Sequence, residues 1–182
     1  MTSLGHSLVG ASVGVLCIPG IDKLHRRLII FVATIAVASL PDWPLPNWGH
    51  FNLALSHSIV VNGAVIVCLV VGLCLKSPSV WQVHRCVIIG LIAAWLSHFL
   101  LDALYVDSRL AIFWPLSEAT VSLPVPWLKT LPHVPPPFDE KVVRILMFET
   151  LTFMPLLVLA AVIRWRKATA RMLLIVSNEG SF

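Results

Sequence analysis

The chain has 182 residues, of which 58% are hydrophobic and only 12% are charged. Average soluble domains carry roughly 25% charged residues, so this composition excludes an ordinary soluble domain and predicts one integral membrane domain over residues 1–182. The formal net charge of +4 comes from Lys and Arg residues that are spread between apolar runs, and this pattern argues against a nucleic-acid partner.

Five apolar segments follow one another along the chain and predict an all-α, multi-pass membrane helical bundle. A membrane span needs about 20 residues, with a range of roughly 17 to 25. The third, fourth and fifth segments reach this length, whereas the first two are short and could be tilted or paired as a partly inserted hairpin. The five segments cover residues 7–21, 28–40, 58–75, 87–105 and 142–165.

The basic residues orient this bundle, because the cytoplasmic loops of membrane proteins are enriched in Lys and Arg. Nine of the thirteen follow the first, third and fifth segments, and four lie between residues 106 and 144. We therefore expect a protein of the cell (inner or cytoplasmic) membrane whose N-terminus and loop 106–141 face the external or periplasmic side. The nine are Lys23, Arg26, Arg27, Lys76, Arg85, Arg164, Arg166, Lys167 and Arg171, and the four are Arg109, Lys129, Lys141 and Arg144.

The loop 106–141 is rich in proline and contains Trp114 and Trp127. Proline at this density is incompatible with a regular helix, and tryptophan favours the membrane interface. We therefore expect an ordered external flap that lies on the lipid headgroups. The polar tail, residues 171–182, is expected to be frayed.

Six ionisable side chains lie near the segment ends that this topology places outside. An ionisable residue at membrane depth costs about 2.5 to 3.5 kcal/mol on insertion scales, so it usually has a function. His98 and Asp102 have the i, i+4 spacing that puts both on one helix face. Because the other members belong to the other four segments, we expect the set to converge on one membrane level. The six residues are His6, Asp42, His57, His98, Asp102 and Glu149.

Imidazole and carboxylate groups together form the ligand set of Zn and of other first-row divalent metals. A buried cation also cancels the carboxylate charges that a bilayer penalises. We therefore predict one or two divalent ions as cofactor, with Zn favoured and Mn as the alternative. The predicted metal ligands are His6, Asp42, His57, His98 and Asp102, with His50 and Glu149 as further candidates for contact with metal or substrate.

Each of these residues also has a purely structural interpretation. His6 and His57 could be interfacial polar groups, and Asp42 could cap a backbone amide in the turn LPDWP. Glu149 could be a packing contact between helices or a proton relay. The convergence of the whole set, rather than any single member, favours the metal site.

Five short motifs in order make the chain resemble the YdjM-like family of membrane-bound metal-dependent hydrolases. They are GHSLVG, LPDWP, LSHSIV, AAWLSHFLLDAL and FWPLS, and the match covers residues 5–117 and extends more loosely to Glu149. The resemblance implies metal-site roles for His6, Asp42, His57, His98 and Asp102. A more distant likeness, to zinc-dependent phospholipase C and the related single-strand nucleases, rests on the same His and Asp spacings.

The chain departs from the family pattern just before His57. Asn52 stands where the family has a histidine, and Ser56 stands where the family has a threonine. His50 lies two residues before Asn52 and could take over from the missing histidine.

The sequence thus predicts a membrane-bound metal-dependent hydrolase that acts on a lipid-like phosphodiester or ester at the outer membrane face. Asp42 or Glu149 would handle the proton, with Asp139 and Glu140 as substitutes for Glu149. The expected partners are the lipid bilayer and a lipid-like or small phosphodiester or ester substrate.

The alternative is a non-enzymatic metal-binding membrane protein or an ion transporter. A transporter needs polar groups that continue to the opposite side of the membrane. The inner halves of the third, fourth and fifth segments offer apolar residues, Cys and Gly, which favours the enzyme.

Overall fold

The structure is a computed structural model that describes residues 3–19, 23–49, 53–105, 110–123, 125, 127–129 and 140–179. Within these ranges the chain is helical and forms no named strand, which confirms the all-α prediction. The elements in chain order are α1 (Ser3–Cys17), α2 (Leu24–Ala38), the 3-10 turn η1 (Leu40–Asp42), α3 (Leu53–Ser56), α4 (Ile59–Lys76), α5 (Pro78–Leu104) and α6 (Glu140–Glu179).

Three of these helices are long and apolar enough to cross a membrane, namely α4, α5 and the part of α6 from Glu140 to Ala170. The helices α1 and α2 have 15 residues each. At 1.5 Å per residue such a helix is about 22 Å long, which is shorter than a hydrocarbon core of about 30 Å. The third, fourth and fifth predicted segments therefore have the length of membrane spans, and the first two do not.

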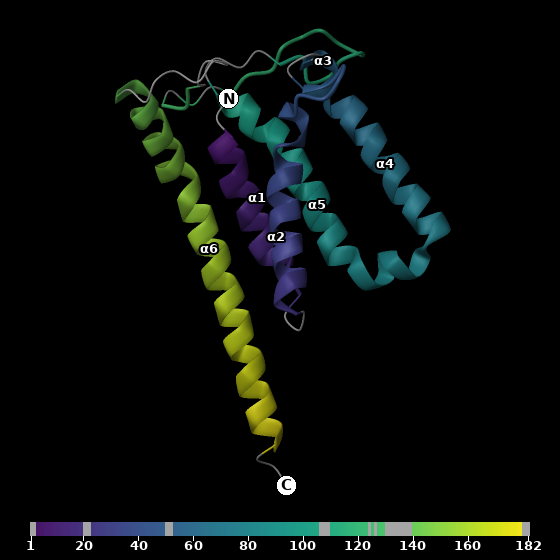
Figure 1. Cartoon of the computed structure of the whole chain (residues 1–182), viewed down its shortest axis with the longest axis vertical. Helices are drawn as coiled ribbons and strands as arrows, with labels where there is room; N and C mark the ends of the chain where they lie inside the picture. Colours follow the sequence, from purple (N-terminus) through teal and green to yellow (C-terminus); the bar gives the residue numbers. More distant parts are fainter. Residues whose placement is uncertain are drawn as a thin grey trace.

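The helices form one bundle in which α1 and α2 lie side by side in the middle (Figure 1). Helix α1 packs against α2, α5 and α6, whereas α4 packs against α5. Small residues allow α1 and α2 to approach closely, because a Cβ atom on Gly10 would lie 2.8 Å from both Ala38 Cβ and Thr34 O. This contact fixes the end of α2 against the first turns of α1.

Two helix boundaries differ from the prediction. The stretch 76–85, which separates the third and fourth apolar segments and is expected from them to be a loop, is mostly helical, because α4 ends at Lys76 and α5 already begins at Pro78. Hydropathy marks where a helix becomes apolar rather than where it begins, and His84 and Arg85 belong to a polar first part of α5. The tail 171–182, expected to be frayed, continues α6 as far as Glu179.

The described parts of the loop 106–141 are fastened to the helix ends at one end of the bundle. The amide of Leu123 donates to Ala103 O at 2.6 Å, and the amide of Ile59 donates to Ile112 O at 2.8 Å. Figure 1 shows this part of the chain running across the upper end of the bundle. The prolines at 124, 126, 132 and 135–137 lie outside the described residues.

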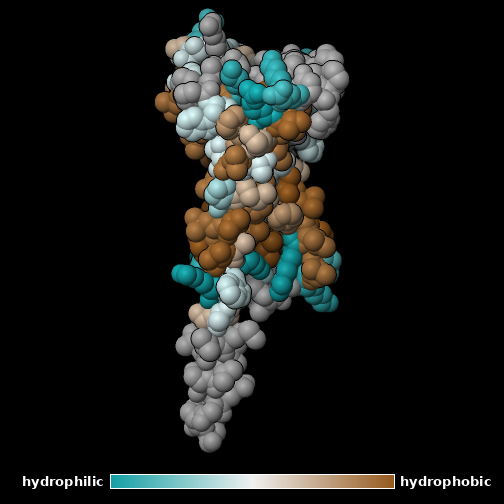
Figure 2. Space-filling view, turned by 90° about the vertical axis from the view of Figure 1, so that its left-hand side faces the viewer, coloured by the Kyte–Doolittle hydropathy of each residue, from teal (hydrophilic) through white to brown (hydrophobic). Residues whose placement is uncertain are grey.

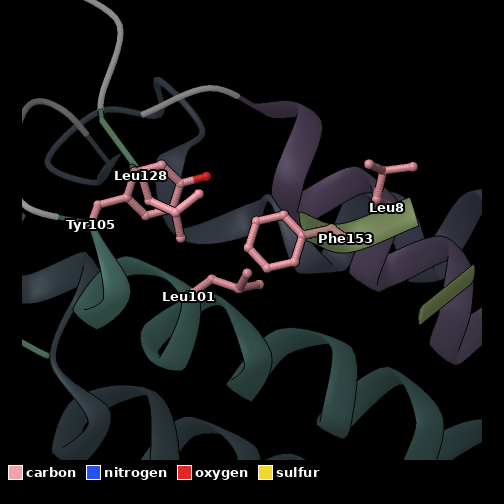
Figure 3. Close-up of a cluster of buried hydrophobic side chains, with 5 residues drawn as sticks. All are labelled: Leu8, Leu101, Tyr105, Leu128 and Phe153. Carbon is pink, nitrogen blue, oxygen red and sulfur yellow. The ribbon is translucent and has the colours of Figure 1, made fainter. Parts of the chain in front are cut away.

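A cluster of buried apolar side chains joins α1, α5, α6 and the loop at the same end. It consists of Leu8, Leu101, Tyr105, Leu128 and Phe153. Figure 3 shows the rings of Tyr105 and Phe153 and the side chain of Leu101 turned toward a common centre. Leu128 therefore anchors residues 127–129 to the end of α5.

The outward face of α6 is apolar over its middle turns. Its exposed side chains there include Leu151, Leu156, Val158 and Leu159. Figure 2, which looks at the side of the bundle that carries α6, shows a belt of hydrophobic side chains between hydrophilic groups above and below. An exposed apolar belt of this kind matches the hydrocarbon layer of a bilayer.

Candidate metal centre

The five predicted metal ligands come together at the end of the bundle where α1 begins and α5 ends, which we call the site end. His6 lies in the first turns of α1, Asp42 ends η1, and His57 lies between α3 and α4. His98 and Asp102 lie one turn apart on α5. The side chains of His6, His57, His98 and Asp102 are buried, with residue exposures of 0–2%.

Asp102 lies at the centre of the histidines. Its Oδ1 atom is 3.1 Å from His6 Nε2, and its Oδ2 atom is 3.3 Å from both His57 Nε2 and His98 Nε2. The rings of His6 and His98 are stacked with their centroids 4.0 Å apart. One carboxylate thus faces three imidazoles, and its two oxygens face different members of the set.

Asp42 closes the cluster from the side that reaches solvent. Its Oδ1 atom is 3.1 Å from His57 Nε2 and 3.7 Å from His98 Nε2, and its side chain keeps 18% of its exposure. Burial disfavours the charged form of Asp42, but the hydrogen bond with His57 and the nearby His98 hold the pKa of this carboxyl below its ordinary value. Asp42 is therefore an ionised group at the edge of the site.

Contacts outside the cluster fix the orientation of two histidines. His98 Nδ1 donates to Ala38 O at 2.8 Å, because a carbonyl can only accept. His57 Nδ1 lies 2.7 Å from Ser56 Oγ, whose own hydroxyl donates to Gly49 O at 3.3 Å, so Ser56 accepts from His57. Both rings therefore carry a proton on Nδ1 and turn Nε2 into the cluster, as metal-ligating histidines do.

This arrangement calls for positive charge between the ligand atoms. The Nε2 atoms of His57 and His98 are only 3.4 Å apart, with the Asp42 and Asp102 carboxylates beside them. Since Nδ1 of His57 already donates, a hydrogen bond from its Nε2 to Asp42 requires a doubly protonated ring. A divalent ion would supply the same charge while its ligands stay neutral imidazoles and carboxylates.

Two overlapping groups of ligand atoms could hold a metal ion. One consists of His6, His98 and Asp102 and the other of Asp42, His57 and His98, and within each group the atoms lie within 4.8 Å of one another. His98 can serve only one ion, because its Nδ1 is engaged by Ala38. Asp102 could serve both, because its oxygens face different histidines. The donor set therefore fits one or two ions.

A break between two helices places His57. Helix α3 ends at Ser56 and α4 begins at Ile59, with Ser58 as the N-cap whose hydroxyl accepts from Val61 N at 3.1 Å. The buried side chain of Asn62 holds this break, because its Nδ2 donates to Ser56 O at 2.9 Å and to Ser58 O at 2.7 Å. Trp95 Nε1 on α5 donates in turn to Asn62 Oδ1 at 3.0 Å.

Asn62 and Trp95 belong to the surroundings of this site although no sequence motif pointed to them. Asn62 carried a signal, since apart from Ser58 it is the only strongly polar residue in the apolar segment 58–75. A lone amide in such a segment needs hydrogen-bond partners within the protein. Its partners could not be read from the sequence.

Glu149, predicted as a catalytic residue or further ligand, belongs to neither of the two ligand groups. It is buried on α6, with 1% exposure, and accepts a hydrogen bond of 2.6 Å from the hydroxyl of Tyr105. Tyr105, the only tyrosine of the chain, caps α5 three residues after Asp102 and was not singled out from the sequence. A Tyr105–Glu149 pair thus stands beside the cluster.

Of the remaining candidate site residues, only Glu140 lies within the described residues. Glu140 is exposed and bonds Arg144 at 2.6 Å, so it is a surface ion pair at the start of α6. His50, Asn52 and Asp139 lie outside the described residues.

Comparisons of the chain with protein-family models, with curated proteins and with solved structures gave no match. The resemblance to the YdjM-like family rests on the five sequence motifs alone.

Proposed function

We propose that the chain is a membrane-bound metal-dependent hydrolase of the cell membrane, with its site facing the external or periplasmic side. The observation that carries this proposal is the buried cluster of three histidines and two aspartates, in which the Nε2 atoms of His57 and His98 converge with the Asp102 carboxylate. Its residues are the ligand types of Zn, with Mn as the alternative. The five motifs that resemble the YdjM-like family support the same assignment.

The residues divide into holding and proton-handling roles. An ion would be held by His6, His98 and Asp102 or by Asp42, His57 and His98. In the first case Asp42 does not ligate the ion and can handle the proton. A divalent ion in this place would make water nucleophilic at neutral pH and polarise the scissile bond.

Asp42 is suited to accept the proton of the attacking water. It lies at the solvent edge of the cluster, and the lowered pKa of its carboxyl keeps it ionised. The Tyr105–Glu149 pair would complete a second proton route or position the substrate from the α6 side.

The level of the cluster in the bundle supports a lipid-like phosphodiester or ester as substrate. It lies at the site end of the bundle, where α1 begins and α5 ends. Nine of the thirteen Lys and Arg residues lie toward the opposite end of the bundle, so the positive-inside rule favours an external position for this end. A site at headgroup depth meets the ester and phosphodiester bonds of lipids, which favours them over soluble substrates.

An ion carrier is less well supported by the buried polar residues. On α1 and α2 these continue from the site end to Ser12 and Thr34, whose hydroxyls donate to Leu8 O at 2.7 Å and to Phe31 O at 2.8 Å. Both hydroxyls are satisfied by their own helix, whereas a carrier needs groups that receive the ion along its path.

Metal analysis combined with turnover tests the proposal. The protein purified in detergent should contain about one or two equivalents of Zn or Mn, by the ligand count of the cluster. It should hydrolyse at least one member of a panel of lipid phosphodiesters and esters, and a chelator should abolish this turnover. Metal without turnover of any panel member would favour the non-enzymatic metal-binding alternative, and absence of metal would reject the site itself.

A further inference from the structure

A cavity lies between residues 127–129 and the first turns of α6. Its volume is about 620 Å³, within the range of roughly 300 to 1,000 Å³ that small-molecule sites occupy. Three basic and three apolar side chains contribute to its lining. They are Lys129, Lys141 and Arg144, and Trp127, Ile145 and Phe148.

The basic residues of this cavity are unusual for their position in the chain. Between residues 86 and 163 the sequence contains only four Lys or Arg residues, and three of them line the cavity. Arg144 is also bonded to Glu140, which lines the same cavity, so the lining carries three positive charges and one negative charge. The cavity therefore favours an anionic ligand.

Four of the residues that α6 contributes to the lining form one amphipathic stripe. Lys141, Arg144, Ile145 and Phe148 have the spacing i, i+3, i+4 and i+7, which places them on one face of the helix. The charged pair lies nearer the start of α6, and the apolar pair lies further along toward the apolar belt. Charge followed by apolar surface in this direction matches a headgroup followed by an acyl chain.

Two relationships join the lining of the cavity to the Tyr105–Glu149 pair. Ile145 and Glu149 are one turn apart on the buried face of α6, and Glu149 bonds Tyr105. Leu128, beside Lys129, packs in the same apolar cluster as Tyr105 (Figure 3). The lining residue Ile145 thus lies one turn along α6 from the Tyr105–Glu149 pair.

We propose that this cavity binds the phosphate group of an anionic membrane lipid, with Lys129, Lys141 and Arg144 around the phosphate and the acyl chain along Ile145 and Phe148. The assignment of this lipid as substrate rests on the proposed hydrolase function, whereas its binding does not. The metal cluster itself carries the carboxylates of Asp42 and Asp102, so a separate cationic cavity explains how an anionic substrate is held beside it.

Binding of a fluorescent phosphatidic acid to the purified protein in neutral-detergent micelles tests this proposal. The double variant Lys129→Gln/Lys141→Gln should bind it roughly 10- to 30-fold more weakly, following the contribution of each basic residue near an anionic lipid surface. The matched control is Arg166→Gln/Lys167→Gln, which removes the same charge from an exposed stretch of α6 away from the cavity. It should change binding less than about twofold.

Competition identifies the source of the phosphate. Unlabelled phosphatidic acid should displace the probe, while phosphatidylcholine and inorganic phosphate at the same concentration should displace it far less. Equal weakening in both double variants, or equal displacement by phosphatidylcholine, would overturn the cavity assignment. Displacement by inorganic phosphate as strong as by the lipid would overturn the lipid as its occupant.

The metal content of each variant shows whether the variant is still folded, so a loss of lipid binding at normal metal content can be assigned to the cavity. Every variant should keep the metal content of the unmodified protein, because none of the changed residues belongs to the cluster. If the double variant loses metal, the single variant Lys129→Gln, which leaves α6 unchanged, should still weaken binding about fivefold, and unaltered binding there would reject the proposal. Selective lipid binding without hydrolysis would reject the substrate assignment and leave the lipid site standing.

Discussion

His57 and His98 turn their Nε2 atoms toward each other at 3.4 Å, although His57 lies in the break between α3 and α4, His98 lies on α5, and the two are 41 positions apart in the chain. Each ring is held from outside the cluster through Nδ1, by Ser56 and by Ala38 O. With both Nδ1 atoms protonated, this approach requires either a second proton on one of the rings or a cation near the two nitrogens. This relationship is the physical reason for expecting a metal ion.

Removal of a central ligand should therefore empty the site. We expect His98→Ala and Asp102→Ala each to lower bound Zn or Mn to near background. Loss of a residue that only hydrogen-bonds to a ligand lowers metal affinity about 10- to 100-fold, and loss of a ligand itself should lower it further. Elemental analysis of the purified variants measures this directly. Cys68→Ala, which alters an exposed thiol on α4, is the control and should leave the metal content unchanged. Full occupancy in both ligand variants would refute the metal site.

The hydroxyl of Ser56 should matter although it is not a ligand. Ser56→Ala removes the acceptor of His57 Nδ1, so metal affinity should fall about 10- to 100-fold. Ser56→Thr keeps the hydroxyl and should restore affinity. Ser97→Ala is the matched control, because Ser97 precedes His98 but its hydroxyl donates to Ala94 O of its own helix. A competition titration with a chelating dye measures the affinity, and equal values for the alanine variants at 56 and 97 would contradict this role.

The amide of Asn62 should couple stability to metal binding. Asn62→Leu deletes two donors and leaves the carbonyls of Ser56 and Ser58 without these bonds, at a cost of about 1–3 kcal/mol for each buried group left unsatisfied. We expect a lower thermal midpoint and weaker metal binding together, because His57 lies between the two carbonyls.

Two tryptophan variants give the matched comparison for this amide. Trp95→Phe removes the indole donor to Asn62 and should lower the thermal midpoint and the metal affinity in the same direction, to a smaller extent. Trp81→Phe removes an indole from the first turn of the same helix α5 and should have little effect on metal affinity. A large loss of metal affinity in Trp81→Phe would show that indole loss acts through general destabilisation of α5.

The sequence indicated how far along its helix each site residue lies, but not toward which neighbouring helix its side chain points. Apolar segments and charge distribution set how far along each helix a residue lies, and His6, His57 and His98 share a level for this reason. The same reasoning gave Glu149 the correct level, but it could not give the side of α6 that faces Tyr105. Rotation of a helix about its axis depends on packing against its neighbours, and that packing arises from residues distant in the sequence.

Helix boundaries and hydrogen-bond partners show the same limit. Residues 78–85 separate two apolar segments in the sequence and yet form the first turns of α5, because hydropathy reports contact with lipid and not backbone conformation. The partners of Asn62 lie on either side of the α3–α4 break and 33 residues away at Trp95. Local spacing could not identify such a partner, although burial of a polar amide implied that one exists.

Orientation in the membrane is testable by cysteine labelling in intact cells. In a variant without the four native cysteines, Ser122→Cys should react with a membrane-impermeant maleimide and Ser79→Cys should not. Both residues are exposed in the described structure, so a difference in labelling reports the side of the membrane. The expected pattern follows from the excess of Lys and Arg where α4 meets α5 and in the last part of α6. The opposite pattern would place the metal centre on the cytoplasmic side.

Glu149 is the residue whose role distinguishes catalysis from simple metal binding. It is buried on α6 beside Tyr105 and outside both ligand groups, so its removal should spare the metal content. If the Tyr105–Glu149 pair transfers a proton, Glu149→Gln should lower turnover of the lipid substrate about 10²- to 10⁴-fold, because the amide keeps the shape but cannot take up a proton.

Two further variants complete the comparison at Glu149. Tyr105→Phe should reduce turnover as well, because it removes the hydroxyl that donates to Glu149. Glu118→Gln, which changes an exposed carboxylate of the loop, is the control and should retain full activity. The measurement is kcat and KM for each metal-loaded variant in lipid micelles. Full kcat in Glu149→Gln would remove this carboxylate from the proton route and leave Asp42 as the base, whereas a raised KM at unchanged kcat would make Glu149 a residue that positions the substrate.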